Sequence, residues 1–170
     1  MSDSSRKIGD VTRSEALSLL SGVALGRIVF TENAMPAVRP ASHIVEAGDI
    51  IARSHDGSVI VPPATGGRGR GAGRFAGPGR FSGPGGSGGS AGSAGSRWET
   101  VVAYQADEID MVSRLGWSVV VTGPARPVLD PAEIDRFATA LSPWSDDEEG
   151  QLIRIHPGIV TGYRLIAQPN

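Results

Sequence analysis

The order of apolar and polar residues along the chain predicts many short strands and only two or three short helices. Thr12-Arg13-Ser14-Glu15 has the spacing of a capping box, and apolar residues follow it at helical spacing as far as Val23. From Gly26 onward the apolar period changes to two, which is typical of strands. A second helix is predicted to start at Asp130, because a capping residue followed by proline favours the first helical turn.

Polar turns, rather than helices, join the predicted strands. These strands cover residues 27–31, 37–45, 50–54, 100–104, 117–123, 152–155 and 160–166. Turns at 32–36 and 46–49 make a meander of the first three, and Pro40 marks an edge or a bulge in the second. We expect residues 107–110 to form a polar connection. The pattern argues against a doubly wound sheet and predicts a mainly β fold, a small barrel of about six strands.

Composition narrows the class of protein. The chain has 170 residues, no cysteine and a formal net charge of −2. The length suits one domain, and the lack of cysteine excludes a disulfide scaffold, a cysteine zinc site and a thiol nucleophile. The uncharged run at 16–26 is shorter than the roughly 20 residues of a membrane span, and the acidic start does not match a secretory signal. We therefore expect no membrane association and a cytoplasmic location.

A low-complexity segment interrupts the pattern. We divide the chain into a single domain at 11–166, a Gly/Arg/Ser-rich insertion at 62–97 within it, and a flexible N-terminus at 1–10. The insertion contains a tandem repeat, 73–78 and 79–84, and its composition predicts disorder. Arginines and phenylalanines at 68–81 allow weak nucleic-acid contact. Because there are only a few of these arginines and phenylalanines, we favour the interpretation that the segment is a tolerated surface insertion without a binding role.

Few residues form a recognisable chemical motif. A Walker loop, a nucleophile elbow and a zinc-type histidine pair are all missing, and the three histidines lie on different predicted elements. We therefore predict no metal site and assign no catalytic residue. Arg39 and Arg53 lie on adjacent predicted strands near Ser42, Ser54 and Ser58. They either form an anion site with hydroxyl donors or pair with surface acids.

Several segments carry a family resemblance by their order and spacing. They are Gly26–Thr31, Pro36–Pro40, Ile51–Ser54, Asp107–Asp110, Gly116–Gly123, Ile153–Pro157 and Val160–Gly162. Together they resemble the pyridoxamine 5′-phosphate oxidase-like family of FMN-binding split barrels, over residues 11–60 and 99–166.

The resemblance implies a six-stranded split β-barrel and a homodimer with two flavin sites between the protomers. It places a strand along the isoalloxazine ring, a phosphate-binding group on the next strand, and a tryptophan from either subunit at the ring edge. The implied cofactor-binding residues are Arg39, Pro40, Ala41 and Ser42 for the ring, Arg53, Ser54, Gly57 and Ser58 for the phosphate, and Trp117 for the edge. Trp117 is equally consistent with a core or interface position.

The resemblance implies an FMN-dependent oxidoreductase, or a deazaflavin-dependent one, that passes hydride from a reduced nicotinamide to a small acceptor. Pyridoxamine phosphate oxidase activity itself is not expected, because the usual substrate-phosphate residues are not apparent. Relatives commonly carry lysine where this chain has Val59. Either Arg68 or Arg70 of the insertion replaces that charge, or flavin binding is weakened or lost. The alternative function is a non-enzymatic dimeric ligand-binding or interaction module whose insertion contacts nucleic acid or protein.

Overall fold

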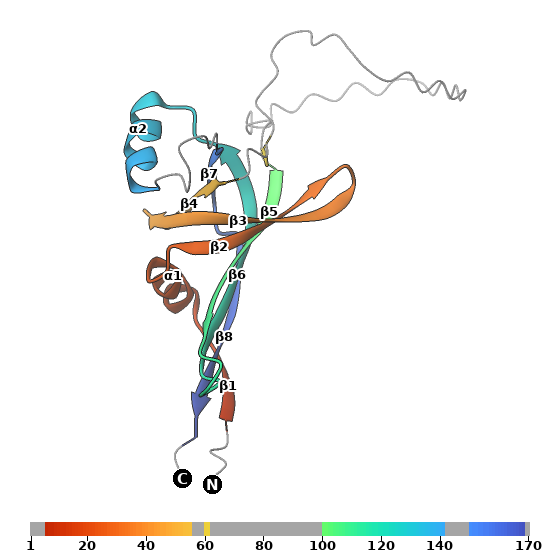
Figure 1. Ribbon diagram of the computed structural model, residues 1–170, viewed down its shortest axis with the longest axis vertical. Coiled ribbons are helices and arrows are strands. Elements are labelled where there is room, and N and C mark those ends of the chain that lie inside the picture. The colour runs from red at the N-terminus through yellow and green to blue at the C-terminus, as the bar shows by residue number, and fades with distance from the viewer. Residues whose placement is uncertain (1–5, 56–59, 62–99, 142–149, 169–170) are drawn as a thin grey trace, which may run out of the picture.

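The computed structural model describes residues 6–55, 60–61, 100–141 and 150–168. Within these ranges lie eight strands and two helices (Figure 1). The strands are β1 (Arg6–Asp10), β2 (Leu25–Glu32), β3 (Met35–Glu46), β4 (Asp49–Ser54), β5 (Thr100–Ile109), β6 (Gly116–Pro127), β7 (Leu152–Ile155) and β8 (Ile159–Ala167). The helices are α1 (Arg13–Ser21) and α2 (Pro131–Ala140).

The six strands β2 to β7 close into a barrel. Their order is β6-β5-β2-β3-β4-β7, every neighbouring pair is antiparallel, and a second pairing of β6 with β7 completes the circle. Strands β8 and β1 continue the sheet beyond β6, so that a long sheet extends downward from the barrel in Figure 1. The expected mainly β fold with a six-stranded barrel is confirmed.

Strand β6 belongs to both the barrel and the long sheet, because one of its two neighbouring strands changes at Gly123. Up to Thr122 it pairs with β8, and from Ala125 it pairs with β7. A Cβ on Gly123 would collide with the carbonyl oxygen of His156, so only glycine lets the β7–β8 connection come this close. The His156 amide donates to the Pro124 carbonyl at 2.9 Å, which holds the β7–β8 connection against β6 at this point.

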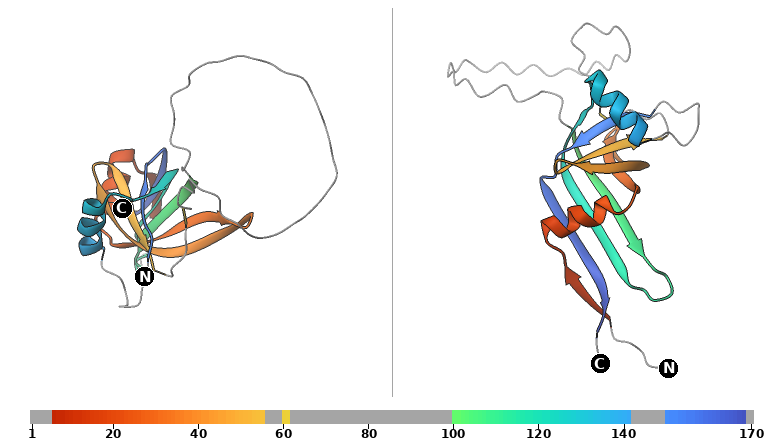
Figure 2. Two further views of the ribbon diagram at one scale, coloured as in Figure 1. Left: turned by 90° about the horizontal axis from the view of Figure 1, so that it is seen from above. Right: turned by 90° about the vertical axis from the view of Figure 1, so that its left-hand side faces the viewer.

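The helices start where the sequence predicts, because their caps are local. Thr12 Oγ1 accepts from the Glu15 amide, and the Glu15 carboxylate accepts from the Thr12 amide, which completes the capping box. The Asp130 side chain accepts from the first-turn amides of α2. Leu20 of α1 packs into the barrel core, whereas Phe137 of α2 belongs to a smaller cluster with residues of β4 and β7. Figure 2 shows the two helices at separate places on the sheet.

The predicted meander is confirmed as β2-β3-β4. Its first turn has positive φ at Asn33 and Ala34 and is therefore a two-residue turn, tighter than the expected 32–36. Its second turn has positive φ at Ala47 and Gly48. Pro40 lies where β3 pairs with β2 and precedes the first β3–β4 pair at Ala41, which agrees with an edge position.

Two segments predicted to be irregular form strands in the structure. The expected polar connection at 107–110 is wrong, because β5 continues through Asp107 to Ile109 and pairs there with β6 beyond the barrel. Side chains on an exposed hairpin are already in contact with water, so a polar stretch there does not indicate a turn. Residues 6–10, assigned to a flexible N-terminus, form β1, which pairs with β8 from Arg6 to Asp10.

The insertion predicted at 62–97 lies outside the described residues. In the part of the chain that the structure describes, neither helix is long and apolar enough to cross a membrane.

Candidate functional site

A groove of about 420 Å³ lies on the outer face of the barrel beside the C-terminal end of α1. Its lining residues are Val23, Ala24, Leu25, Gly26, Arg27, Pro40 and Asp107. The aliphatic residues make an apolar wall, and Arg27 Nη1 lies 3.4 Å from Asp107 Oδ1 at its polar side. Pro40 is the sequence-predicted site residue that contributes to this wall.

Strand register extends this outer face toward β4. Leu25 lies opposite Ser42, and Ser42 lies opposite Arg53. Residues that are directly opposite in a sheet place their side chains on the same face. Leu25, Ser42 and Arg53 therefore form a row beside Pro40, next to the groove.

The guanidinium of Arg53 is held at the edge of this face. Its Nη1 donates to the carbonyl oxygen of Leu141, just after α2, at 3.2 Å. A Cβ on Gly150 would come within 3.0 Å of the Arg53 side chain, so the backbone there packs closely on it. The positive charge is thus kept at one end of the row.

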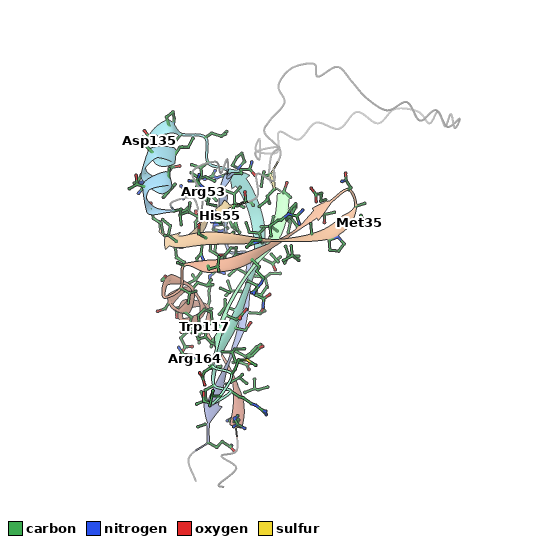
Figure 3. All side chains as sticks on the ribbon, viewed as in Figure 1. Met35, Arg53, His55, Trp117, Asp135 and Arg164 are labelled. Carbon is green, nitrogen blue, oxygen red and sulfur yellow. The ribbon has the colours of Figure 1, made fainter. Side chains whose placement is uncertain are left out.

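A histidine that the sequence analysis did not assign to the site joins the same face. His55 Nε2 lies 2.9 Å from Ser42 Oγ and accepts from the Ser42 amide at 3.3 Å. A backbone amide can only donate, so Nε2 carries no proton and the Ser42 hydroxyl also donates to it. Figure 3 shows His55 beside Arg53. No sequence spacing could identify it, because the contact depends on the β3–β4 register.

The remaining predicted residues of these strands point to the opposite face. Ala41 and Ser54 are directly paired and fully buried in the barrel. The Ser54 amide donates to the Gln151 carbonyl, and the Ser54 hydroxyl accepts from the Gln151 amide at 3.1 Å. Arg39 lies on the arm formed by β2 and β3, 3.3 Å from Glu32 Oε2 and over the Phe30 ring. Alternation along β3 thus divides Arg39–Ser42 between two faces.

His43 and Trp117 are both parts of the core. His43 is 2 % exposed, and burial lowers its pKa. Its Nε2 donates to the Leu20 carbonyl oxygen at 2.9 Å, which ties α1 to the barrel. Trp117 is 7 % exposed, and Figure 3 shows it on the long sheet, away from Arg53 and His55. Within the chain, the structure does not bring Trp117 to the row of Ser42 and Arg53.

Some predicted residues cannot be placed. Gly57, Ser58 and Val59 lie outside the described residues, as do Arg68 and Arg70 of the insertion. Among the residues that are described, no group of three histidine or acidic side chains has an arrangement that could hold a metal ion.

An apolar row crosses the outer face of the sheet beyond the groove. Each residue of the row pairs directly with the next one on the neighbouring strand. In order, the row is Val38, Val29, Ala103, Thr122 and Ile159. The two ends, Val38 and Ile159, are 51 % and 65 % exposed. An uncovered apolar surface across five strands is typical of an interaction face.

Comparison with known proteins agrees with this architecture. The family described as Pyridoxamine 5'-phosphate oxidase matches residues 12–68 and 81–164. An uncharacterized protein of Mycobacterium tuberculosis, Rv0080, is 37% identical over 164 residues, which cover 96% of this chain and 90% of that protein.

Solved structures share the fold. A Corynebacterium glutamicum protein is 22% identical with a TM-score of 0.61 over 99% of each chain. The FAD binding protein from Mycobacterium smegmatis is 24% identical with a TM-score of 0.55, covering 92% of this chain and 98% of that one. A FAD-binding protein from Mesorhizobium loti is 15% identical with a TM-score of 0.55, covering 95% and 99%. The family match spans most of the sequence and the barrel is the one that the fold comparison finds, so this chain belongs to the pyridoxamine 5'-phosphate oxidase family.

Proposed function

We propose that the protein binds a flavin, FMN, on the outer face of β2, β3 and β4 and acts as an oxidoreductase. The observation that carries the proposal is the register that aligns Leu25, Ser42 and Arg53 beside the 420 Å³ groove. An apolar wall, a hydroxyl and a guanidinium in one row match the three parts of a flavin mononucleotide: ring, ribityl chain and phosphate.

Each group has a defined task in this proposal. Arg53 neutralises the phosphate, and its contact with Leu141 reduces the side-chain entropy lost on binding. Leu25 and Pro40 exclude water from one side of the ring. The Ser42 hydroxyl donates a hydrogen bond to His55, so its oxygen is oriented to accept a hydrogen bond from the ligand.

A bound flavin supplies hydride transfer, here from a reduced nicotinamide to a small acceptor. The protein contributes binding, orientation and exclusion of water, and we assign no residue as general acid or base. Two solved structures with this fold are of FAD-binding proteins, which supports a flavin as the ligand class. Use of a reduced nicotinamide is consistent with a cytoplasmic location.

We further propose that the protein is a homodimer joined through the apolar row from Val38 to Ile159. This row adjoins the groove, since Val29 and Arg27 lie on the same face of β2. A second copy would bury the exposed aliphatic side chains and cover the groove. Trp117 lies on the core face of β6, opposite to the face that carries Thr122, so this interface does not require Trp117 in the flavin site.

The test compares two arginines on opposite faces of neighbouring strands. The purified protein is examined for flavin absorbance and titrated with FMN, FAD and a deazaflavin. We expect Arg53→Gln to weaken FMN binding at least tenfold, Arg53→Lys to restore part of it, and Arg39→Gln to leave it unchanged. Circular dichroism verifies that each variant is folded.

Three outcomes would contradict the proposal. A colourless protein that binds none of the three cofactors would overturn flavin binding. A protein that binds only the deazaflavin would replace FMN with that cofactor. Equal losses in the Arg53 and Arg39 variants would overturn the assigned face.

A binding module without catalysis is the second candidate. The amide and the hydroxyl of Ser54 both form hydrogen bonds with the Gln151 backbone. This residue of the predicted phosphate site is therefore occupied within the fold, which favours the second candidate. Flavin binding without nicotinamide-dependent reduction would support it. Salt-sensitive retention on nucleic acid that disappears on deletion of residues 64–97 would assign the interaction to the insertion.

A further inference from the structure

A second pocket lies on the outer face of the barrel where β4, β6 and β7 meet. Its volume is about 190 Å³, and its lining residues are Asp49, Pro124, Ala125, Arg126, Arg154 and His156. Asp49 begins β4 and Arg53 lies near its end, so about 13 Å of strand separates this pocket from the proposed flavin face. The two sites share no lining residue.

Two arginines face this pocket from adjacent strands. Arg126 on β6 lies directly opposite Arg154 on β7, so the two guanidinium groups are on one face. Arg154 is held in place: its Nη2 donates to Glu133 Oε1 at 2.8 Å, and its Nη1 donates to Asp49 Oδ2 at 3.5 Å. Arg126 is exposed and makes no ion pair or hydrogen bond within the described residues. Asp49 and Glu133 already balance the charge of Arg154, so among the described residues Arg126 carries the positive charge of this pocket that an anion would balance.

A histidine completes the wall. His156 Nδ1 lies 2.9 Å from Asp49 Oδ1, and because a carboxylate only accepts, Nδ1 carries the proton. This contact fixes the ring orientation and leaves Nε2, which has no partner among the described residues, as a hydrogen-bond acceptor for a hydroxyl group of a ligand. The side chain is 69% exposed, so a ligand can reach it from solvent.

We propose that this pocket binds a small oxyanion, a phosphate or carboxylate group, between Arg126 and Arg154, and that His156 Nε2 accepts a hydrogen bond from the hydroxyl of a hydrogen phosphate. Paired guanidinium donors are well suited to an oxyanion, because they match two of its oxygens at once. A water occupies about 30 Å³, so the pocket holds a phosphate group with a few waters but is too small for a flavin. The inference does not depend on the proposed flavin function.

The probes are inorganic phosphate and acetate, titrated separately into the full chain at constant ionic strength. Backbone amide resonances of residues 124–126 and 154–156 are followed by NMR. We expect saturable shifts, and we expect Arg126→Gln to weaken the affinity at least tenfold. Saturation by phosphate alone, by acetate alone or by both identifies the oxyanion class.

A control variant separates this pocket from general surface charge. Arg164→Gln removes an exposed arginine on β8, which Figure 3 places on the long sheet, and should leave the affinity unchanged. Arg53→Gln should also leave these shifts unchanged, and Arg126→Gln should bind FMN like the wild type. Shifts that do not saturate, or equal losses in the Arg126 and Arg164 variants, would overturn the proposal.

Discussion

The hydroxyl of Tyr104 lies 2.6 Å from Nδ1 of His43 inside the barrel. His43 Nε2 must carry a proton because it faces the Leu20 carbonyl, so in the neutral ring Nδ1 accepts from the phenol. The same hydroxyl lies 3.1 Å from the Ala41 carbonyl oxygen. One buried chain of polar groups thus connects α1, β3 and β5, and β3 carries Ser42 on its other face.

Removing the phenol should destabilise the fold. Tyr104→Phe leaves Nδ1 of His43 buried without a donor, which costs about 1–3 kcal/mol of unfolding free energy. Urea denaturation measures the change. Tyr163→Phe, at a position that is 39% exposed, should stay within about 0.5 kcal/mol of the wild type. Equal stability of Tyr104→Phe and wild type would refute the assigned hydrogen bond.

The stability should depend on pH through His43. Burial lowers the pKa of this imidazole from its ordinary value of 6.5, so below that pH the unfolded chain binds more protons than the folded one. His43 therefore contributes its full stability above about pH 7 and loses it as the pH falls through 6.5 toward the lower folded-state pKa. Urea denaturation between pH 5 and 8 should show this slope in the wild type and a smaller one in His43→Gln. An identical slope in both proteins would assign the pH dependence to other groups.

Gly26 is required where β2 passes Tyr104. An added Cβ would collide with the Tyr104 hydroxyl and with the Gln105 carbonyl, which is backbone and cannot rotate away. Gly26→Ala should lower the unfolding free energy by about 1–3 kcal/mol, the usual cost of overpacking. Gly9→Ala is the matched control, because nothing lies within 4 Å of its Cβ. If both variants melt at the same temperature, the close approach at Gly26 is not real.

Gln151 fixes the short segment at Ile60 and Val61. Its Oε1 accepts from both amides at 3.0 Å, and its Nε2 donates to the Val61 carbonyl. Gln151→Ala should remove three hydrogen bonds, lower stability by about 2 kcal/mol and speed amide exchange at 60–61. Gln105→Ala, with an exposed side-chain contact, serves as control. Unchanged exchange at Ile60 would show that other contacts hold the segment.

The proposed dimer depends on Ala103, at the centre of the apolar row between Val29 and Thr122. Ala103→Glu places a charge in the interface, and we expect it to convert the dimer to a monomer in light scattering after gel filtration. Glu108→Ala, on the exposed hairpin beyond the barrel, should leave the mass unchanged. A dimer that persists in the Ala103→Glu variant would move the interface elsewhere.

Local signals in the sequence were sufficient for the elements. Helix caps at Thr12 and Asp130 depend on residues three or fewer positions away, and the period of two along Arg27–Thr31 is visible without a partner strand. The meander followed from its short polar turns. These signals predict the barrel, whereas the family follows only from the resemblance carried by segments such as Gly116–Gly123.

Local signals were not sufficient for the site. Arg39 and Ser42 are three residues apart, so strand alternation puts them on opposite faces, but only the register with Arg53 shows which face carries the groove. His55 reaches Ser42 through the same register. Residues 107–109 were misassigned because a polar stretch reads alike in a turn and in an exposed strand, and β1 forms only because β8 offers it an edge.

Local sequence decided most of the segments that become strands and helices, because hydrogen-bonding caps and side-chain periodicity act over a few residues. The exceptions, β1 and the end of β5, depend on a partner strand. Tertiary structure alone decided which side chains meet. Arg126 opposite Arg154 and Gly123 against His156 join residues about 30 positions apart, and such pairings depend on barrel closure and strand register. Those are properties of the whole sheet, since a shift of one residue in any pairing would turn every side chain of that strand to the other face.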